Sequence, residues 1–257
     1  MRFSVLASGS GGNACYVETD ECRLLIDAGL SCRETIRRLE MIRVDPQGLD
    51  ALILTHEHHD HIKGAGPIVR RFDIPLYLNA ATLRRGIKTL GHVQRPVPVS
   101  TGQTITIKDI FVETFTKCHD AADPMGIVLS SNGVRMGLIT DIGRSTHVVE
   151  DRLRGCQALI LEFNHDLEML EKGSYPLDLK KRIRGPEGHL SNNQAGELLG
   201  TLCHADLKKV VLAHLSRENN VPQRAIQIAE EVLVQRGHSH TEILVSHQDE
   251  PLPLVAL

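Results

Sequence analysis

Three histidines and one aspartate lie in a single short stretch of the chain, at His56, His58, Asp60 and His61. Neither a helix nor a strand has a period that places all four on one face, so we expect the four side chains to converge on something. Neutral imidazole nitrogens and carboxylate oxygens are ligands that Zn²⁺ and other first-row ions accept. The stretch therefore predicts a metal site, and the alternative is a solvated loop that happens to be rich in histidine.

The elements before this stretch alternate between strands and a helix. Strands are predicted at 2–7, 14–18, 24–26 and 51–54, and Ser31-x-x-Glu34 predicts a capping box at the start of a helix. The glycine-rich segment between the first two strands predicts a tight turn, which could also contact an anion. The alternation indicates an α/β architecture.

Three further candidate residues come directly after predicted strands, namely His119, Asp141 and His214. The ends of neighbouring strands can meet at one edge of a sheet, so we expect these residues to gather near the first four. A lone aspartate after a strand is also a common helix cap, which is the alternative for Asp141. Glu162 ends another predicted strand, and Ser191-x-x-Gln194 predicts the capping box of a helix that begins just after His189.

Length and composition indicate a globular protein. At 257 residues, with 41% hydrophobic and 24% charged residues, the chain can bury the core of one domain. No apolar run is long enough for a signal peptide or a membrane span, so we expect a cytoplasmic protein with no membrane partner. The six cysteines include no Cys-x-x-Cys pair, which is against a zinc ribbon or a disulfide framework.

The net charge of −3 provides no overall attraction to nucleic acid, but the positive charges are clustered. One cluster, Lys180-Lys181-Arg182-x-Arg184, lies just upstream of His189. Such a patch can hold phosphates, and the alternative is an ordinary solvated helix face.

The pattern Thr55-His56-x-His58-x-Asp60-His61 after a buried strand resembles the metal-binding signature of the metallo-β-lactamase superfamily. The resemblance implies a four-layer αββα sandwich of the α/β class that covers residues 1–257 as a single domain. Glu162 and Gly188-His189 are also distantly similar to the same regions of RNase Z enzymes. Within the superfamily the chain looks closest to the YycJ/WalJ group, through the motifs Ser8-Gly9-Ser10-x-Gly12-Asn13, His119-Asp120-Ala121, Asn164-His165-Asp166, Gly188-His189-Leu190-Ser191-Asn192 and Ala213-His214-Leu215-Ser216.

The resemblance also implies two divalent metal ions, zinc or manganese, with iron as a further candidate. By its ligand pattern one ion would be bound by His56, His58 and His119, the second by Asp60, His61 and His214, and Asp141 would bridge them. Seven ligands for two ions leave coordination positions open, as a catalytic site requires. Asp27 matches an aspartate that supports the ligands from behind in this superfamily.

A two-metal site of this kind favours hydrolysis of a phosphodiester by a metal-bound hydroxide. Asp60 could orient that hydroxide, and His189 is the candidate acid for the leaving oxygen, held charged and oriented by Glu162. His165 is the second candidate for the acid. Substrate contacts are predicted at the helix start and at the basic cluster, from Ser191, Asn192, Lys180 and Lys181.

The YycJ/WalJ resemblance implies a 5′-to-3′ exonuclease that hydrolyses DNA, with RNA as a second possible nucleic-acid partner. Aromatic residues make up 3% of the chain and tryptophan is absent, so binding is expected through the phosphate backbone, without sequence preference. The main alternative is a small-molecule metallohydrolase, such as a cyclic phosphodiesterase or a thioesterase. A metal-dependent binding module is a third hypothesis, although it would need neither Asp60 nor His189. The sequence does not predict an oligomeric state.

Overall fold

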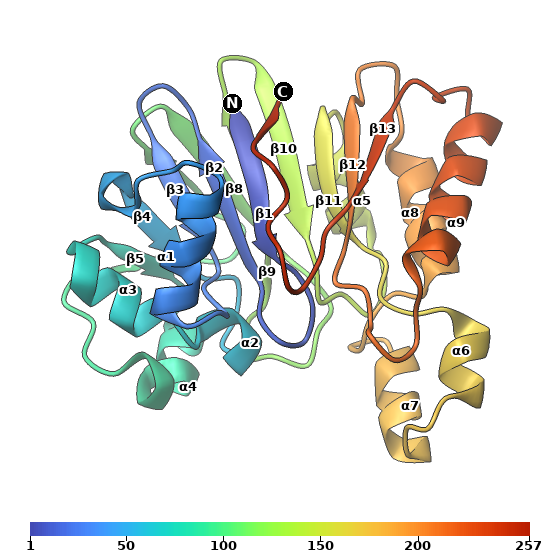
Figure 1. Cartoon of the computed structure of the whole chain (residues 1–257), viewed down its shortest axis with the longest axis horizontal. Helices are drawn as coiled ribbons and strands as arrows, with labels where there is room; N and C mark the ends of the chain where they lie inside the picture. The colour runs from blue at the N-terminus through green and yellow to red at the C-terminus, as the bar shows by residue number, and fades with distance from the viewer.

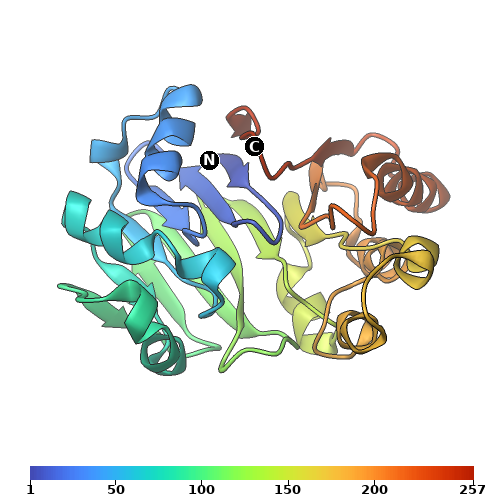
Figure 2. The same cartoon turned by 60° about the horizontal axis from the view of Figure 1, so that its bottom comes forward.

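The computed structural model describes residues 1–257 as two facing sheets with helices on their outer sides (Figures 1 and 2). The first sheet has the order β14-β1-β2-β3-β4-β5-β6 and the second β13-β12-β11-β10-β9-β8-β7. The α/β sandwich expected from the metallo-β-lactamase resemblance is confirmed.

The strands of the first sheet are β1 (Arg2–Ala7), β2 (Ala14–Glu18), β3 (Arg23–Ile26), β4 (Ala51–Ile53), β5 (Leu76–Leu78), β6 (Pro96–Pro98) and β14 (Val255–Ala256). Those of the second are β7 (Thr104–Ile107), β8 (Ile110–Thr116), β9 (Met125–Ser131), β10 (Val134–Ile139), β11 (Ala158–Glu162), β12 (Lys209–Ala213) and β13 (Glu242–Val245). The helices are α1 (Cys32–Met41), α2 (His59–Ile62), α3 (Ala65–Phe72), α4 (Ala80–Leu90), α5 (His147–Leu153), α6 (Leu167–Lys172), α7 (Leu177–Arg184), α8 (Asn192–Leu202) and α9 (Pro222–Gln235), with a short 3₁₀ turn at Pro46–Gly48.

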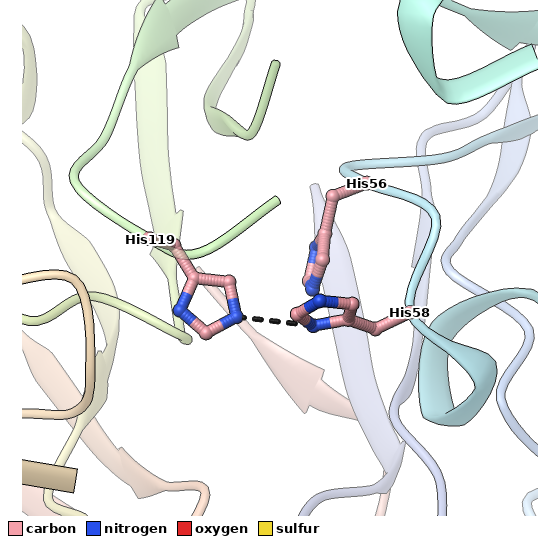
Figure 3. Close-up of side chains that lie close together, drawn as sticks. All are labelled: His56, His58 and His119. Atoms are coloured by element: carbon pink, nitrogen blue, oxygen red, sulfur yellow. Dashed lines mark hydrogen bonds between the residues drawn. The ribbon is translucent and has the colours of Figure 1, made fainter. Parts of the chain in front are cut away.

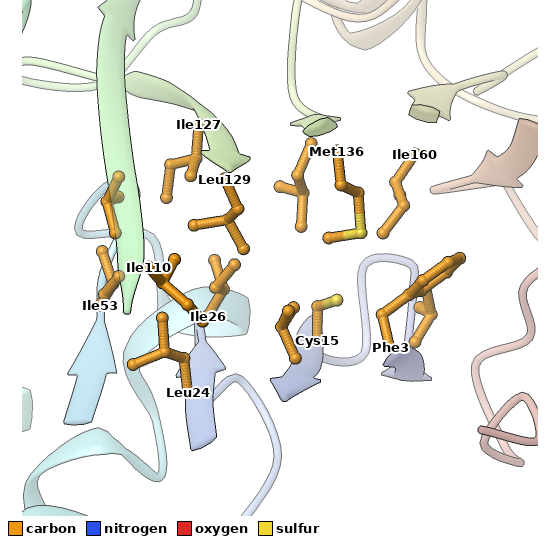
Figure 4. Packing of buried hydrophobic residues seen from close by; sticks show 14 of the residues in the cluster. Phe3, Cys15, Leu24, Ile26, Ile53, Ile110, Ile127, Leu129, Met136 and Ile160 are labelled. Carbon is orange, nitrogen blue, oxygen red and sulfur yellow. The ribbon is translucent and has the colours of Figure 1, made fainter. Parts of the chain in front are cut away.

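Three apolar layers hold the sandwich together. Between the sheets, Phe3, Cys15 and Ile26 of the first sheet face Met136 and Ile160 of the second (Figure 4). Separate clusters pack α1 and α3 on the outer side of the first sheet and α5, α8 and α9 on the outer side of the second. The apolar side chains of each cluster are buried and packed against one another, which fixes the sheets and their helices relative to each other.

Parallel pairing decides where the polar residues lie. Strands β3, β4 and β5 run parallel to one another, as do β10, β11 and β12. Their carboxyl ends therefore carry Asp27, the His56 loop, Asp141, Glu162 and His214 to a common edge of the sandwich.

The two predicted capping boxes differ in the structure. At α8 the Ser191 side chain accepts from the Gln194 backbone N–H, and the Gln194 side chain reaches back to Ser191, so this box is confirmed. At α1 the Ser31 side chain accepts from the Glu34 backbone as expected. The Glu34 carboxylate, however, pairs with Arg37 and Arg38, since these cations outcompete a single backbone N–H. No helix of the structure combines the length and apolar character needed to cross a bilayer.

Candidate metal centre and active site

One histidine cluster joins the loop after β4 to the loop after β8. The rings of His56, His58 and His119 have centroids 4.7 to 5.1 Å apart (Figure 3). Nε2 of His119 lies 3.2 Å from Nδ1 of His58. Their ligand atoms are close enough together to hold one ion.

A second group adjoins the first through Asp141. This residue is buried. Its Oδ2 lies 3.1 Å from Nε2 of His61, and its Oδ1 lies 3.6 Å from Nδ1 of His214. The rings of His56 and His61 are 4.0 Å apart, and Asp60 Oδ2 is 3.6 Å from His61 Nε2. The structure thus brings all seven residues of the predicted ligand set to one site, with Asp141 between the two groups.

The hydrogen bonds of the imidazoles orient them for metal binding. Nδ1 of His56 bonds to Thr55 Oγ1 at 2.9 Å, and Nδ1 of His61 bonds to Asp27 Oδ2 at 2.8 Å. With Nδ1 occupied by an oxygen partner, Nε2 is the nitrogen left for an ion.

Unpaired buried atoms provide the test of whether this site fits metal ions. Nε2 of His56, Nε2 of His214 and Oδ2 of Asp141 are buried and form no well-aligned hydrogen bond in the protein, although Oδ2 lies 3.1 Å from Nε2 of His61. Buried polar atoms are rarely left without one. These atoms are nitrogen and carboxylate donors that divalent first-row ions accept, so the residues fit metal binding.

The backbone is strained at three positions of this site. Asp27, Asp141 and His214 have φ values of 57°, 55° and 57°, in the left-handed region that favours glycine. Each such residue costs on the order of 1–3 kcal/mol, and such strain persists only where the surrounding structure enforces it. The β-sheet ends therefore impose an unfavourable conformation on residues whose side chains must point into the site.

Burial and charge set the protonation of the histidines. Burial lowers the pKa of His56 well below its usual value and that of His119 to about 4. Burial also opposes protonation of His214, but Asp141 and Glu162 outweigh it and raise the pKa to about 9. For His61, Asp141 and Asp27 likewise overcome burial and raise the pKa. At neutral pH the metal-free site therefore holds protons that an ion must displace.

We accordingly expect the affinity for divalent ions to rise with pH. Below a pKa of about 9 for His214, each displaced proton contributes about a tenfold gain in apparent affinity per pH unit. Competition with a chromophoric chelator between about pH 6.5 and 8.5 measures this slope. An affinity independent of pH in this range would show that ions bind without displacing the His214 proton.

Glu162 connects the metal centre to His189. This fully buried carboxylate accepts from Nδ1 of His214 at 2.7 Å and from Nδ1 of His189 at 2.9 Å. Burial alone would raise the pKa of Glu162, but His189 and His214 lower it below its usual value, so it stays ionised. Its remaining bonds come from the backbone N–H groups of Asp141, Ile142 and Leu190, each at 3.1 Å.

A pocket of about 200 Å³ opens beside His189 and His214. One wall is α7, which contributes Arg182, and the guanidinium of Arg182 forms two contacts of 2.6 to 2.7 Å with the carboxylate of Asp120. Asp120 Oδ1 in turn lies 3.5 Å from Nε2 of His119. A cation on α7 is therefore held at the edge of the candidate metal centre.

The predicted substrate contacts lie elsewhere than expected. Ser191 and Asn192 are buried: Ser191 caps α8, and the Asn192 amide bonds to Asn220. Their side chains are thus already engaged inside the protein and do not reach the pocket. Lys180 donates to the carbonyl of Glu171, and neither it nor Lys181 lines the pocket. The basic cluster reaches the site through Arg182 instead.

His165, the second candidate acid, is buried outside the pocket lining. Both of its ring nitrogens are buried without a partner, and burial lowers its pKa to about 4. Burial thus favours the neutral ring, which is a far weaker acid than the imidazolium form that an efficient general acid of this kind uses.

Sequence reasoning missed two residues of the site. Nδ2 of Asn13 lies 3.0 Å from His61 Nε2 and 3.1 Å from Asp60 Oδ2, so the glycine-rich turn supplies a side chain to the metal loop. Lys117 is buried and donates to the carbonyl of Thr140 at 2.6 Å, next to Asp141. The motif Ser8-Gly9-Ser10-x-Gly12-Asn13 was a signal for the first, but no pattern pointed to the second.

Comparison with known proteins agrees with this geometry. The chain is 37% identical over 253 residues to the exodeoxyribonuclease YycJ of Bacillus anthracis, covering 98% of this chain and 96% of that protein. It is 39% identical over 234 residues to the exodeoxyribonuclease WalJ of Streptococcus pneumoniae, covering 88% and 85%. A ribonuclease Z of Bradyrhizobium diazoefficiens is 30% identical over 158 residues, or 55% of this chain and 51% of that protein.

The fold has equally clear counterparts. The metallo-β-lactamase fold protein YhfI of Bacillus subtilis superposes with a TM-score of 0.75 over 98% of both chains, at 17% identity. The family model of a beta-lactamase superfamily domain matches residues 22–215, which include the seven predicted metal ligands, Glu162 and His189. This chain therefore belongs to the metallo-β-lactamase superfamily, as a metal-dependent hydrolase related to the YycJ and WalJ nucleases.

Proposed function

We propose that this protein is a two-metal phosphodiesterase that removes nucleotides from DNA in the 5′-to-3′ direction without sequence preference. The observation that carries the chemistry is the Glu162 carboxylate shared by His189 and His214. It fixes a proton donor beside a metal-binding residue, with ring centroids 5.1 Å apart. The relatives named exodeoxyribonucleases, which match nearly the whole chain, support DNA as the substrate.

The metal ions would be held by His56, His58 and His119 on one side, by Asp60, His61 and His214 on the other, and by Asp141 between them. Zinc or manganese, when bound there, activates water as a nucleophile and neutralises charge that builds up on the phosphate. Asn13 donates to Asp60 Oδ2, which fixes the carboxylate so that it can accept a hydrogen bond from the attacking water.

His189 and Glu162 have different roles in protonation of the leaving oxygen. Nδ1 of His189 donates to Glu162, so Nε2 is the atom that can carry a proton to the leaving oxygen. Glu162 is fully buried and so does not touch the substrate, and it acts by orienting the His189 ring through their hydrogen bond. Glu162 is therefore a positioning residue.

Digestion of end-labelled oligonucleotides tests the function. Single- and double-stranded substrates, with and without a 5′-phosphate, are incubated in Mn²⁺ or Zn²⁺ with the wild type, Asp60→Ala and Asp151→Ala. Asp151 is an exposed carboxylate on α5, paired only with Arg154, so its variant is a matched control. We expect stepwise products from the 5′ end with the wild type and Asp151→Ala, and their loss with Asp60→Ala. Products from the 3′ end, or no cleavage by protein that contains two ions, would contradict the proposal.

Salt dependence separates a DNA enzyme from the alternative, a small-molecule hydrolase such as a cyclic phosphodiesterase or thioesterase. If three cations such as Lys181, Arg182 and Arg184 contact duplex phosphates, substrate affinity should fall about 40-fold between 50 and 200 mM salt. KM for a duplex substrate at both concentrations measures this. A change of less than about twofold would favour the small-molecule hydrolase.

A further inference from the structure

The pocket beside His189 has a wall that the sandwich itself does not provide. Helices α6 and α7 follow β11 and precede α8 in the sequence, and they protrude beyond the sheet edge at the lower right of Figure 1. From this α6–α7 segment, the pocket is lined by Tyr175, Leu179, Arg182 and Ile183. The opposite side comes from Ser10, Leu215 and Ser216, in the loops after β1 and β12.

The α6–α7 segment and the turn that follows it are attached to two residues at the candidate metal centre, Asp120 and His119. Arg182 pairs with Asp120, whose backbone N–H also donates to the carbonyl of Glu187 at 3.1 Å. The carbonyl of Gly188 lies 3.3 Å from Nδ1 of His119. The α7 wall therefore has a defined position relative to a predicted metal ligand, as a substrate-binding wall requires.

The lining combines two kinds of surface. Leu179, Ile183 and Leu215 are apolar, and the half-buried Tyr175 adds an aromatic ring to them. Arg182 supplies a cation whose side chain is 64% exposed despite its pairing with Asp120. An aromatic ring among apolar side chains is a stacking surface for a base, and a guanidinium is a partner for a phosphate.

The far side of the pocket is unfavourable for a continuing DNA strand. Beyond Leu215 and Ser216 lies a second, open hollow that shares these two residues and contains Arg217, Asp249 and Glu250. One positive and two negative side chains leave it with a charge of −1, and Arg217 is already bound to Asp249. This hollow offers a phosphate backbone no net attraction, which favours a chain end over a strand that passes through the pocket.

We propose that this pocket binds the terminal nucleotide of the DNA, with the Tyr175 ring stacked on its base and Arg182 contacting its phosphate. The inference rests on the proposed function and specifies how the enzyme selects a chain end. Tyr175 and Arg182 are substrate-binding residues in it, and the base is held by its face, which keeps recognition independent of sequence.

Binding of the product to the metal-loaded enzyme tests this without turnover. The protein has three tyrosines and no tryptophan, so the part of the ligand-dependent tyrosine fluorescence that disappears in Tyr175→Phe reports on ligands near Tyr175. We expect a deoxynucleoside 5′-monophosphate to bind about 5- to 150-fold more tightly than deoxyribose 5-phosphate, which has the same phosphate and sugar but no base. Isothermal titration calorimetry of the same ligands gives the affinities independently of fluorescence.

Three variants identify the side chains. In Tyr175→Ala the preference for the base should disappear, while Tyr175→Phe should restore it because the ring is retained. Arg182→Ala should weaken both ligands alike, since both carry the phosphate. Thermal unfolding of each variant controls for the fold, which a half-exposed tyrosine should hardly affect.

The outcomes separate this inference from the proposed function. Equal affinity for the two ligands, or an unaltered base preference in Tyr175→Ala, would overturn the pocket assignment even if oligonucleotides are digested from the 5′ end. If the base preference depended on Tyr175 but the protein cut no DNA, the assignment of the nucleotide pocket would stand and the proposed exonuclease activity would be contradicted.

Discussion

Alanine in place of His189 is expected to lower kcat on DNA by about 10² to 10⁴ while the protein keeps its metal ions. The leaving alkoxide is a strong base, so its departure requires a proton, and His189 is the imidazole at the pocket that Glu162 orients through Nδ1, with Nε2 left to donate. Metal content should persist because His189 is not one of the seven predicted ligands. Measurement of kcat together with bound metal separates the two effects.

A change of leaving group isolates the role of the acid. In thymidine 5′-(4-nitrophenyl) phosphate the leaving nitrophenolate is a weak base that departs without protonation. The loss in His189→Ala should therefore be at least about tenfold smaller on this substrate than on DNA. Equal losses on the two substrates would show that His189 binds or orients the phosphate and does not donate a proton.

His165→Ala is the matched comparison for this experiment. It removes a second imidazole from the same region, but one that is buried and does not line the pocket. We expect it to lower the unfolding temperature through the lost packing, with the same proportional change in rate on both substrates. If the loss in rate depended on the leaving group in His165→Ala but not in His189→Ala, His165 and not His189 would be the general acid.

The metal loop was predictable because its chemistry is local in the sequence. His56, His58, Asp60 and His61 come from one loop, and the buried strand before them fixes which edge of the sheet they reach. His119, Asp141 and His214 were placed by the same argument, since each follows a strand. Strands such as β11 and β12 were found because each contains a continuous run of four apolar residues, as expected for strands covered on both faces.

The α7 wall of the pocket was not predictable from the basic cluster because the phase of α7 was unknown. Four basic residues fall between 180 and 184, but a helix presents only residues three and four apart on one side. In the structure that side is Leu179, Arg182 and Ile183, so the two lysines named from the sequence point elsewhere. Charge composition alone does not show which member of a cluster reaches a site.

At the start of α8 the local prediction of a capping box is confirmed, while the buried positions of Ser191 and Asn192 lend no support to the substrate contacts predicted for them. In the capping box the side chains of Ser191 and Gln194 and the backbone N–H groups of Ser191 and Gln194 bond to one another, and the Asn192 N–H donates to the His165 carbonyl. Asn192 is bound by Asn220, a partner 28 residues away that no local pattern identifies. The contact of Asn13 with His61 spans 48 residues and escaped sequence reasoning for the same reason.

Alanine in place of Gly29 should disable the site without altering any ligand. A Cβ atom at this position would lie 1.6 Å from the carbonyl oxygen of Asp60 and 2.6 Å from the backbone nitrogen of Asn13. Both are backbone atoms, so no rotamer change can relieve the overlap, and the metal loop must move. Its present position depends on close backbone bonds, Asn13 N–H to the Asp60 carbonyl at 2.7 Å and Gly29 N–H to the Asn13 carbonyl at 2.8 Å.

Displacement of the loop by about 1 Å is enough to cost 10²-fold or more in kcat/KM, because the ligands no longer converge on the same points. We also expect fewer than two bound ions per chain and a loss of about 1–3 kcal/mol in unfolding free energy from the overpacking. Gly200→Ala in α8 is the control: its added methyl group would meet only side chains, the nearest being Val232 at 3.3 Å, and alanine favours the helix. If Gly29→Ala kept both ions and full activity, the loop could shift without harm, and the convergence of its ligands would not depend on the close backbone packing seen here.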